Sequence, residues 1–527
     1  MKVVTAGQMQ EIDRITIGNR GLPASVLMGL AGKAVADQII SRMPRLSRIA
    51  VFSGTGNNGG DGFAAAYYCA NSGRHAAVYL AGEPAKISDP AKIYYDLCAN
   101  SGIRVLPVTG AADLAGLELA GYDLIVDAML GTGFSGAPRG IIADIIRAIN
   151  DSDLPVLAVD VPSGLGSDGA APDGEAVIAD VTVTIGLPKI SLVTYPGRHY
   201  AGALHVADIG FPASLTRSDD LKTDLADDEF FRNNAVRAIE SEFSAAADIH
   251  KAEKGHLLLI GGFDGMEGAI MMTAMAALET GVGLVSLLCT PSSRDIIAGR
   301  IPELITMALP AGGDPESPDP RLRKALEDIF KARRYGALVM GPGMGRTPFS
   351  RAVFDTVMDD IHGYGVPRVL IDGDGLSHLA GYLNKHALDK RTEFIVTPHF
   401  MEASRLAGIP VDEIRKNRHR FAGELGRKLS CTVLLKGPAT IVSDGGRHII
   451  NTTGSAALAT AGSGDVLSGI IGALLLRKFQ CLHAAAFGAY IHGKAADLYC
   501  SATGSDIIKA TDILRYIREA KRPAGPS

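Results

Sequence analysis

The chain has 527 residues, 47% hydrophobic and 21% charged, which excludes a disordered or fibrous protein and leaves room for two or three domains. The net charge is −5 and no long basic run is present, which excludes nucleic acid as the expected partner. No apolar run has the ~20 residues of a membrane span and the cysteines avoid CxxC spacing, so we expect a cytoplasmic protein without membrane contact, zinc knuckle or disulfide framework.

The first part of the chain alternates short apolar runs with segments of helical periodicity. This alternation is typical of an α/β domain, in which helices cover a parallel sheet. Strands are predicted at residues 48–52, 76–80, 124–127, 156–160, 181–185 and 204–207. Between Pro212 and Lys254 the strand pattern stops and the chain becomes polar and charged, which indicates a domain boundary near residue 215.

The second part repeats the alternation with a different ending. Strands are predicted at residues 257–260, 284–288, 337–340, 369–372, 394–397 and 433–435. Residues 439–443 and 447–451 are predicted to form a hairpin, because Asp444-Gly445 supplies the positive φ of a tight turn. Only helices are expected after it. The halves share no motif, so we predict two different α/β domains, at residues 1–215 and 222–520.

A glycine-rich string follows the first predicted strand. Gly54-Thr-Gly-Asn-Asn-Gly59 fits the GxGxxG pattern of dinucleotide-binding folds, but Gly131-Thr-Gly-Phe-Ser-Gly136 fits it equally well. Asp61 also lies at the start of the next helix, where a carboxylate repels a pyrophosphate. We therefore expect the string to serve another purpose.

Polar residues gather where three predicted strands end. Asn57, Asn58 and Asp61 follow the first strand, while Asp127 and Asp160 end two later ones. Carboxyl ends of parallel strands open onto one crevice, so these groups are expected to share a site, although singly each could cap a helix or brace a turn. Asparagine, aspartate and serine oxygens suit a hard cation, and Asp160 is left as the acid/base candidate. Lys189 is equally a crevice residue or a solvated loop lysine.

A second candidate site lies near the C-terminus. The amides of Gly462, Ser463 and Gly464 open an apolar helix and can bind an anion, and Asp465 beside them can accept a hydroxyl proton. Lys436, after a buried strand, adds a cation where phosphates would lie. The alternative is that the glycines only permit packing and Asp465 only caps. No GxxxxGK[ST] string is present in the sequence, which excludes a Walker P-loop.

The N-terminal motifs carry a family resemblance. Asn57-Asn-Gly-Gly-Asp-Gly62, Val126-Asp-Ala128 with Gly131-Thr-Gly133, and Val159-Asp-Val-Pro-Ser-Gly164 resemble the NAD(P)HX epimerases, whose domain is Rossmann-like with three layers. The resemblance implies interconversion of the R- and S-hydrates, with Asp160 at the hydrated ring. It implies potassium on Asn58, Asp127 and Ser163. It also implies a substrate site formed by Asn57, Asn58, Gly59, Gly60, Asp61, Gly131, Thr132, Gly133, Phe134, Ser135, Gly136, Ala137 and Asp160.

The C-terminal motifs resemble the ribokinase-like ADP-dependent NAD(P)HX dehydratases. They are His250-Lys251 with Gly255, Gly261-Gly262 with Gly268-Ala269, Gly341-Pro-Gly-Met-Gly345, Thr397-Pro-His399 with Glu402, Lys436-Gly437 and Gly462 to Asp465. The resemblance implies a hydrate site of Ala269, Gly343, Gly345, His399 and Asp465. It implies nucleotide contacts by Lys436, Gly437, Pro438, Ala439, Thr440, Gly462, Ser463 and Gly464. Asp372-Gly-Asp-Gly375 and Thr453-Gly-Ser-Ala456 depart from the family pattern.

The two resemblances together imply a bifunctional repair enzyme. ADP would phosphorylate the hydroxyl of the S-hydrate with Mg²⁺ and Asp465 as base, and loss of phosphate would restore NADH or NADPH beside AMP. The first domain would supply the S-hydrate from its epimer. We also expect a homo-oligomer. Two questions stay open, ADP against ATP and NADHX against NADPHX, as does one alternative function, a small-molecule kinase fused to a non-catalytic nucleotide-binding domain.

Overall fold

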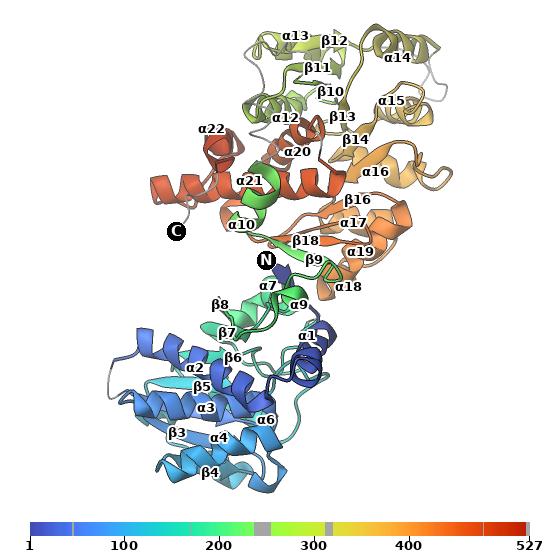
Figure 1. Cartoon of the computed structure of the whole chain (residues 1–527). Coiled ribbons are helices and arrows are strands. Elements are labelled where there is room, and N and C mark those ends of the chain that lie inside the picture. Colours follow the sequence, from blue (N-terminus) through green and yellow to red (C-terminus); the bar gives the residue numbers. More distant parts are fainter. Residues whose placement is uncertain (45–46, 170, 237–253, 311–319, 478, 523–527) are drawn as a thin grey trace. The chain divides into compact units, whose positions relative to one another are not determined.

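A computed structural model describes residues 1–527 except 45–46, 170, 237–253, 311–319, 478 and 523–527 (Figure 1). The chain forms two compact units. One comprises Lys2–Thr223 with Lys416–Arg418, and the other comprises Met1, Asp224–Arg415 and His419–Ser527. None of the described helices combines the length and apolarity needed to cross a bilayer. The His250-Lys251 motif lies outside the described residues.

The first unit is built on a parallel sheet in the order β4-β3-β2-β5-β6-β7-β8. Its strands are β2 (Arg48–Ser53), β3 (His75–Ala81), β4 (Arg104–Val108), β5 (Leu124–Ala128), β6 (Val156–Val159), β7 (Val181–Ile185) and β8 (Ala203–Ala207). The chain runs outward from β2 through β3 to β4 and then continues on the other side of β2 with β5. The crevice at the carboxyl ends of β2 and β5 is therefore a topological switch point, where open α/β sheets bind ligands.

Helices cover both faces of this sheet, as the three-layer prediction requires. Ile49 and Val51 of β2 pack in one core with α2 (Ala24–Arg42), α3 (Asn57–Asn71) and α4 (Asp89–Asn100). Ala50 and Phe52 of the same strand pack in a second core with α6 (Ile141–Asn150). Both faces are buried because successive strand residues point to opposite sides. The remaining helices are α1 (Ala6–Arg14), η1 (Ile15–Asn19), η2 (Pro84–Lys86), α5 (Ala111–Ala115), η3 (Leu119–Gly121), α7 (Ile190–Val193), α8 (Arg198–Ala201) and α9 (Ala213–Thr216).

The second unit has a larger mixed sheet, with the order β9-β18-β17-β16-β15-β14-β13-β10-β11-β12. Its strands are β9 (Thr223–Ala226), β10 (His256–Ile260), β11 (Leu284–Cys289), β12 (Ile305–Ala308), β13 (Ala337–Met340), β14 (Arg368–Ile371), β15 (Glu393–Val396), β16 (Thr432–Leu435), β17 (Thr440–Ser443) and β18 (His448–Asn451). Strands β10 to β16 pair in parallel, whereas β16, β17 and β18 pair antiparallel. The predicted hairpin is confirmed. The switch point of this sheet lies between β10 and β13.

The helix that carries the second candidate site is deeply buried. Helix α20 (Ser463–Leu475) packs between α12 (Glu267–Thr280) and α21 (Cys481–Thr503) and contacts β13 and β14, while α22 (Ala510–Ala520) packs on α12 and α21 (Figure 1). The other helices are α10 (Asp228–Phe231), η4 (Arg232–Val236), α13 (Pro291–Ala298), α14 (Pro320–Ala332), α15 (Pro348–Asp359), α16 (Asp374–Tyr382), α17 (Phe400–Ala407), α18 (Val411–Lys416), α19 (Arg418–Leu429) and η5 (Ala456–Leu458).

The predicted strands are all present, within one or two residues of their predicted ends. Four further strands in the described residues, at or near sheet edges, are the two-residue β1 (Lys2–Val3), β4, β9 and β12. Strand β4 reads Arg-Val-Leu-Pro-Val and is largely exposed, so it lacks the continuous apolar run that marks a buried strand. Strand β9 lies in the polar stretch from which strands were expected to be missing, and that expectation is wrong there.

Candidate active sites

The first site is a cavity of about 640 Å³ at the β2/β5 switch point. It brings together the polar clusters that the sequence places at strand ends, and it includes Lys189. Its polar lining consists of Gln10, Asp13, Thr55, Asn57, Asn58, Asp61, Thr132, Asp160 and Lys189. The loop Gly131 to Phe134 lines it as well. The predicted convergence of these groups on one crevice is therefore present.

Asp160 and Lys189 form a buried ion pair in this cavity. Lys189 is fully buried, and its ammonium donates to Asp160 Oδ1, to Thr184 Oγ1 at 3.0 Å and to the Ile185 carbonyl at 2.9 Å. Asp160 Oδ1 also accepts from the Ile185 amide at 3.0 Å. All three ammonium hydrogens are thus used, and they fix one oxygen of Asp160 while its Oδ2 has no partner among the described residues. Lys189 is therefore a crevice residue, and the alternative prediction of a solvated loop lysine is wrong.

The backbone at Asp160 is unusual. Its φ of 64° lies in the left-handed region, which costs a residue with a Cβ about 1–2 kcal/mol. The conformation is held because the Asp160 amide donates to the Val183 carbonyl at 2.8 Å. Strain of this kind persists where a side chain must be aimed, which fits the acid/base role expected of Asp160.

Two more carboxyl groups line the same cavity. Burial raises the pKa of Asp13, from helix α1, to about 6, with Lys189 opposing and Asp160 reinforcing the shift. Burial, with Asp160 and Asp13 next in importance, raises the pKa of Asp61 well above its usual range. Burial and the two neighbouring carboxyls thus favour the neutral form of Asp61, which repels an anion less than a carboxylate does.

An oxygen-rich cluster lies beside the cavity. Ser163 donates its hydroxyl to Asp127 Oδ1 at 2.6 Å and its amide to Oδ2 at 2.7 Å, and the Leu130 amide donates to the Ser163 hydroxyl at 2.9 Å. Asn58 Nδ2 donates to the Leu130 carbonyl at 2.9 Å, which leaves Asn58 Oδ1 buried and without a partner. Burial raises the pKa of Asp127 to about 6, against the hydrogen bonds from Ser163. The three predicted potassium ligands therefore lie together.

Some predicted contacts do not reach the cavity lining. A Cβ on Gly59 would lie 1.9 Å from the Gly54 carbonyl oxygen, and one on Gly60 would lie 2.4 Å from Met28 Sδ, so both glycines are required by close packing. Gly59, Gly60, Ser135, Gly136 and Ala137 are absent from the residues that line the described cavity. Their assignment as substrate contacts stays a prediction.

The second site surrounds the N-terminus of α20. Gly462 is its N-cap with φ 87°, and no side chain caps the helix. The Ser463 amide donates to the Thr460 carbonyl at 3.3 Å, whereas the amides of Gly464 and Asp465 have no acceptor among the described residues. First-turn amides without partners attract anions. Of the amides of residues 462–464, from which the anion site was predicted, only that of Ser463 therefore has an acceptor among the described residues, and the Asp465 amide is one more free donor.

Asp465 lies on the first turn of this helix. Burial raises its pKa to about 7, and Asp372 reinforces the shift while Lys436 opposes it. The Asp465 carbonyl accepts from Thr273 Oγ1 of α12 at 3.0 Å, which anchors the turn. A carboxyl group that titrates near neutrality is suited to accept a hydroxyl proton.

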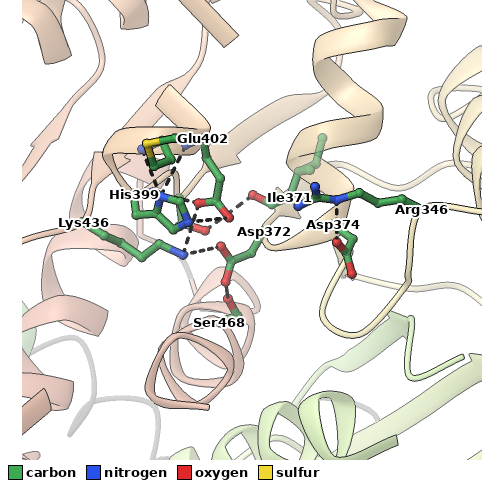
Figure 2. Close-up of polar contacts among 10 residues, drawn as sticks. Arg346, Ile371, Asp372, Asp374, His399, Glu402, Lys436 and Ser468 are labelled. Atoms are coloured by element: carbon green, nitrogen blue, oxygen red, sulfur yellow. Dashed lines mark hydrogen bonds and ion pairs between the residues drawn. The ribbon is translucent and has the colours of Figure 1, made fainter. Parts of the chain in front are cut away.

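Lys436 is held by two carboxylates, one directly after β14 and one on the first turn of α17 (Figure 2). Its Nζ lies 2.7 Å from Asp372 Oδ1 and 3.8 Å from Glu402 Oε2, and Ser468 donates to Asp372 Oδ2 at 2.7 Å. Burial lowers the pKa of Lys436, but Asp372 and Glu402 outweigh it and the net shift is upward. A Cβ on Gly464 would lie 3.6 Å from Lys436 Nζ, so the cation and the amide-lined helix start share one crevice, as predicted.

His399 has a structural role in addition to the predicted substrate contact. Its Nδ1 accepts from the amides of Met401 and Glu402 at 3.1 and 3.3 Å and caps α17, while Nε2 lies 3.3 Å from Glu402 Oε1 (Figure 2). Nδ1 therefore carries no proton and Nε2 does. Burial, with Lys436 next in importance, lowers the pKa of His399, which keeps the ring neutral. Half of the His399 side chain is exposed.

The remaining predicted hydrate contacts form a glycine-lined wall after β13. A Cβ on Gly343, whose φ is 60°, would lie 3.1 Å from the Ala269 Cβ, so these two residues are adjacent. The Gly345 amide donates to Asp374 Oδ2 at 2.9 Å, and Arg346 Nε donates to Asp374 Oδ1 at 3.0 Å (Figure 2). Asp374 also raises the pKa of Asp465 slightly, so this wall faces the same crevice.

The predicted nucleotide loop follows β16. Gly437 and Ala439 have positive φ values of 151° and 52°, and Thr440 Oγ1 donates to the Gly437 carbonyl at 3.0 Å. Pro438 is exposed. In the loop after β14, where the sequence departs from the family pattern, Gly373 has φ 55°, a conformation in which alanine would be strained. That loop is therefore fitted to glycine.

Two residues of these sites escaped sequence reasoning. Asp13 lies on the amphipathic helix α1 and carried no motif, and only its place in the fold reveals it. Asp372 was noted as an acid at a strand end, but its pairing with Lys436, 64 residues away, could not be read from spacing. Acids directly after apolar strands were the available signal.

Comparison with known proteins gives matches to both units. Residues 24–191 match the family described as YjeF-related protein N-terminus, and residues 257–519 match NAD(P)H-hydrate dehydratase. The bifunctional NAD(P)H-hydrate repair enzyme Nnr of Moorella thermoacetica is 35% identical over 525 residues, covering 98% of this chain and 96% of the relative. Its counterpart in Coxiella burnetii is 33% identical over 517 residues, covering 98% of each. A Bacillus subtilis ADP/ATP-dependent NAD(P)H-hydrate dehydratase, co-crystallized with ATP/Mg²⁺, is 27% identical, with a TM-score of 0.44 over 53% of this chain and 93% of that one.

Proposed function

Because the chain belongs to the family of bifunctional NAD(P)H-hydrate repair enzymes, we propose that its first cavity epimerises the hydrated nicotinamide cofactors and that the crevice at α20 dehydrates the S-hydrate. We assign the epimerase to residues 1–215 and the dehydratase to residues 222–520, and we expect the protein to be a homo-oligomer. The observation that carries the dehydratase assignment is Asp465, which lies beside free amides and Lys436 and has a pKa of about 7.

The dehydratase step follows from these groups. The hydrate hydroxyl is a poor leaving group, and phosphorylation makes it a good one. Asp465 takes the hydroxyl proton as the oxygen attacks the terminal phosphorus of ADP, and AMP leaves. The amides of Gly464 and Asp465 stabilise the charge on the transferred group, and Lys436 neutralises the neighbouring phosphate. Breaking the carbon–oxygen bond then releases phosphate and leaves an iminium, and loss of a proton to solvent from the neighbouring ring carbon restores the reduced ring.

Mg²⁺ fits this crevice as an ion that the nucleotide brings. No group of three or more acidic, histidine or cysteine side chains in the described residues could hold a metal alone. Asp372 and Asp374 already accept hydrogen bonds, whereas Asp465 has a carboxylate without a partner among those residues. Mg²⁺ usually combines one or two carboxylates with phosphate oxygens and water. It would neutralise phosphate charge, with Asp465 as the carboxylate that is available to hold it.

The epimerase site fits a potassium ion. Asn58 Oδ1 is a buried oxygen without a partner, and it lies in a cluster whose other members are the Asp127 carboxylate, the Ser163 hydroxyl and the Leu130 carbonyl. All are hard oxygen donors. A cation held there by Asn58, Asp127 and Ser163 would orient the 131–134 loop toward the phosphates of the substrate.

The test supplies the purified chain with hydrated NADH as a mixture of epimers. With ADP and Mg²⁺, the absorbance of reduced nicotinamide should return for both epimers, and chromatography should show AMP and phosphate. Repeating the assay with ATP, and with hydrated NADPH, decides the donor and the cofactor. Replacing potassium by choline should slow epimerisation and leave dehydration of pure S-hydrate unchanged. Failure to recover reduced nucleotide from the S-hydrate with either donor would contradict the proposal.

A further inference from the structure

The epimerase cavity contains more acid than one ion pair can balance. Asp13, Asp61, Asp160 and Lys189 all line it, and Lys189 is the only cation among its lining residues. The three hydrogen bonds of the Lys189 ammonium are already made, to Asp160, Thr184 and Ile185. The positive charge is therefore committed to Asp160, and Asp13 and Asp61 have to share the cavity without a cation of their own.

Asp13 and Asp61 come from different elements and remain available to a ligand. Asp13 lies on α1 and Asp61 on the first turns of α3, and neither side chain has a hydrogen-bond partner among the described residues. The titratable groups that face Asp61 are Asp160, Asp13 and Lys189, together with Tyr94 of α4. Two uncompensated carboxyls in one cavity cannot both be ionised cheaply, so at least one of them holds a proton. The pKa values of both carboxyls are raised, chiefly by burial, which agrees with this geometry.

We propose that Asp61 is the acid of the epimerase site, opposite Asp160 as the base, and that Asp13 is a positioning residue which keeps the proton on Asp61. The inference deepens the proposed epimerase function and rests on it. The cavity supplies both partners that inversion at one carbon needs, a carboxylic acid and a carboxylate with a free oxygen. Asn58, whose unpartnered Oδ1 is assigned above to potassium, lines the same cavity.

The chemistry of the hydrate defines the step. Hydration of an enamine places the hydroxyl on the carbon attached to the ring nitrogen. Asp61 donates its proton to that hydroxyl, the carbon–oxygen bond breaks with both electrons going to oxygen, and water leaves while the nitrogen lone pair forms an iminium bond. A second water attacks the opposite face, Asp160 Oδ2 accepts its proton, and the electrons return to nitrogen. One proton passes from Asp61 to Asp160, solvent water is exchanged, and the reverse direction uses the same groups in opposite roles.

The decisive experiment measures epimerisation of pure R-hydrate by the full chain with potassium and without ADP, so that the dehydratase stays silent. In oxygen-labelled water the wild type should place one labelled oxygen in every molecule of S-hydrate formed. Asp61→Asn has nearly the same size but lacks an acidic carboxyl proton, and it should lower kcat by about 10²–10⁴-fold with KM within a few-fold of wild type. Unlabelled product, or a kcat for Asp61→Asn within threefold of wild type, would overturn the proposal.

Asp13→Asn tests the positioning role through the pH profile. Wild-type kcat should fall at alkaline pH as Asp61 loses its proton. Without the Asp13 carboxylate, Asp61 ionises more easily, so this alkaline limb should move to lower pH while kcat on the acid side is retained. Gln10→Ala is the matched control, because Gln10 also lines the cavity from α1 but cannot ionise, and its profile should not move. An unmoved limb in Asp13→Asn would overturn the positioning role. A wild-type chain that does not epimerise at all would instead refute the proposed function.

Discussion

Because the Asp465 carboxyl group titrates near neutrality, its role as a base can be tested through the pH dependence of dehydration. Burial and the nearby Asp372 raise its pKa to about 7, and only its ionised form can accept a proton. The kcat/KM for dehydration should therefore rise with pH through about 7 and level off above it, because this ratio reports the free enzyme. Initial rates with pure S-hydrate on both sides of neutrality measure the limb.

Asp465→Asn should remove the rise of kcat/KM with pH together with most of the dehydration activity. Loss of a general base costs about 10²–10⁴-fold in rate, so dehydration should fall by that factor while epimerisation of the R-hydrate by the same preparation is unchanged. The epimerase rate serves as the internal control for folding and concentration. A limb that survives in Asp465→Asn would assign the titration to another group.

The Lys436–Asp372 pair predicts a stability change in the second unit. Asp372 is buried, and Lys436→Met would leave its carboxylate with the Ser468 hydroxyl but no cation. Removing one partner of a buried pair costs about 3–5 kcal/mol, which urea unfolding of the second unit should detect. Ser468→Ala, which removes one hydrogen bond to a charged group, should cost less, about 1.5–3 kcal/mol.

The pH dependence of that difference has a definite sign. Burial raises the pKa of Asp372, but Lys436 and the hydrogen bonds outweigh it and the net shift is downward. A lowered carboxyl pKa stabilises the folded state above the unfolded pKa, about 3.9, and this contribution is lost as pH falls through the folded value. The gap between wild type and Lys436→Met should therefore be full at neutral pH and shrink in acid. A constant gap would mean that packing, not charge, accounts for the loss.

At the scale of elements, the start of α20 separates stability from activity. A Cβ on Gly464 would meet nothing closer than Lys436 Nζ at 3.6 Å and Asp372 Oδ2 at 3.9 Å, both ordinary contacts that face the crevice. Gly464→Ala should therefore fold, with a helix about 0.5–1 kcal/mol more stable, but the methyl group would occupy the space predicted for the transferred phosphoryl group. We expect unchanged or higher Tm and at least tenfold weaker use of the nucleotide.

Gly462→Ala is the matched control on the same turn. Gly462 has φ 87°, and its Cβ would lie 2.3 Å from Met272 Cε, so alanine is both strained and crowded. This variant should lose stability where Gly464→Ala does not. If Gly464→Ala kept full dehydration activity, the phosphoryl group would have to lie away from this helix start.

The elements that carry function were the predictable ones. Buried parallel strands are visible in the sequence as apolar runs, and charged groups of both crevices follow those runs directly, as Asp160, Asp372 and Lys436 do. The edge strands β4 and β12 were missed because an edge needs neither a continuous apolar run nor freedom from proline. A continuous apolar run marks a strand that is buried on both faces, and edge strands are not buried in this way.

Pairings between distant elements were beyond the sequence. Asp13 lies on a polar helix face and reaches the first cavity only because α1 packs near the switch point. Lys189 could be a crevice residue or a solvated one until β7 and β6 were placed side by side. The free amides at 464 and 465 depended on where α20 begins and on the bond from Ser463 to Thr460. Tertiary contacts decide these matters, and local propensity does not encode them.

At the scale of the whole molecule, each unit places its candidate site at the carboxyl ends of the parallel strands of its own sheet. Both sheets reverse their strand order once, at β2/β5 and at β10/β13, and both place their charged groups where carboxyl ends of parallel strands meet. The residues described for each site belong to one unit, because the lining of the first cavity lies within residues 2–223 and the second crevice within residues 224–527. We predict that the product of one site travels to the other as a free small molecule.

If the hydrate exchanges freely between the sites, a mixture of two full-length variants, each inactive at one site, should restore the whole reaction. Asp160→Asn should convert the S-hydrate to reduced nucleotide normally and leave the R-hydrate almost untouched, whereas Asp465→Asn should interconvert the hydrates and recover no reduced nucleotide. Mixing the two variants should restore recovery from pure R-hydrate, with a lag that shortens as the Asp160→Asn concentration rises, because S-hydrate must first accumulate in solution. Absorbance of the reduced ring, followed with ADP and Mg²⁺ present, measures both the lag and the rate. The same lag for the wild-type chain, at equal site concentration, would mean that it releases its intermediate into solution. No lag for the wild type, together with no recovery of reduced nucleotide by the mixture, would contradict this prediction and mean that the hydrate is passed on without leaving the protein.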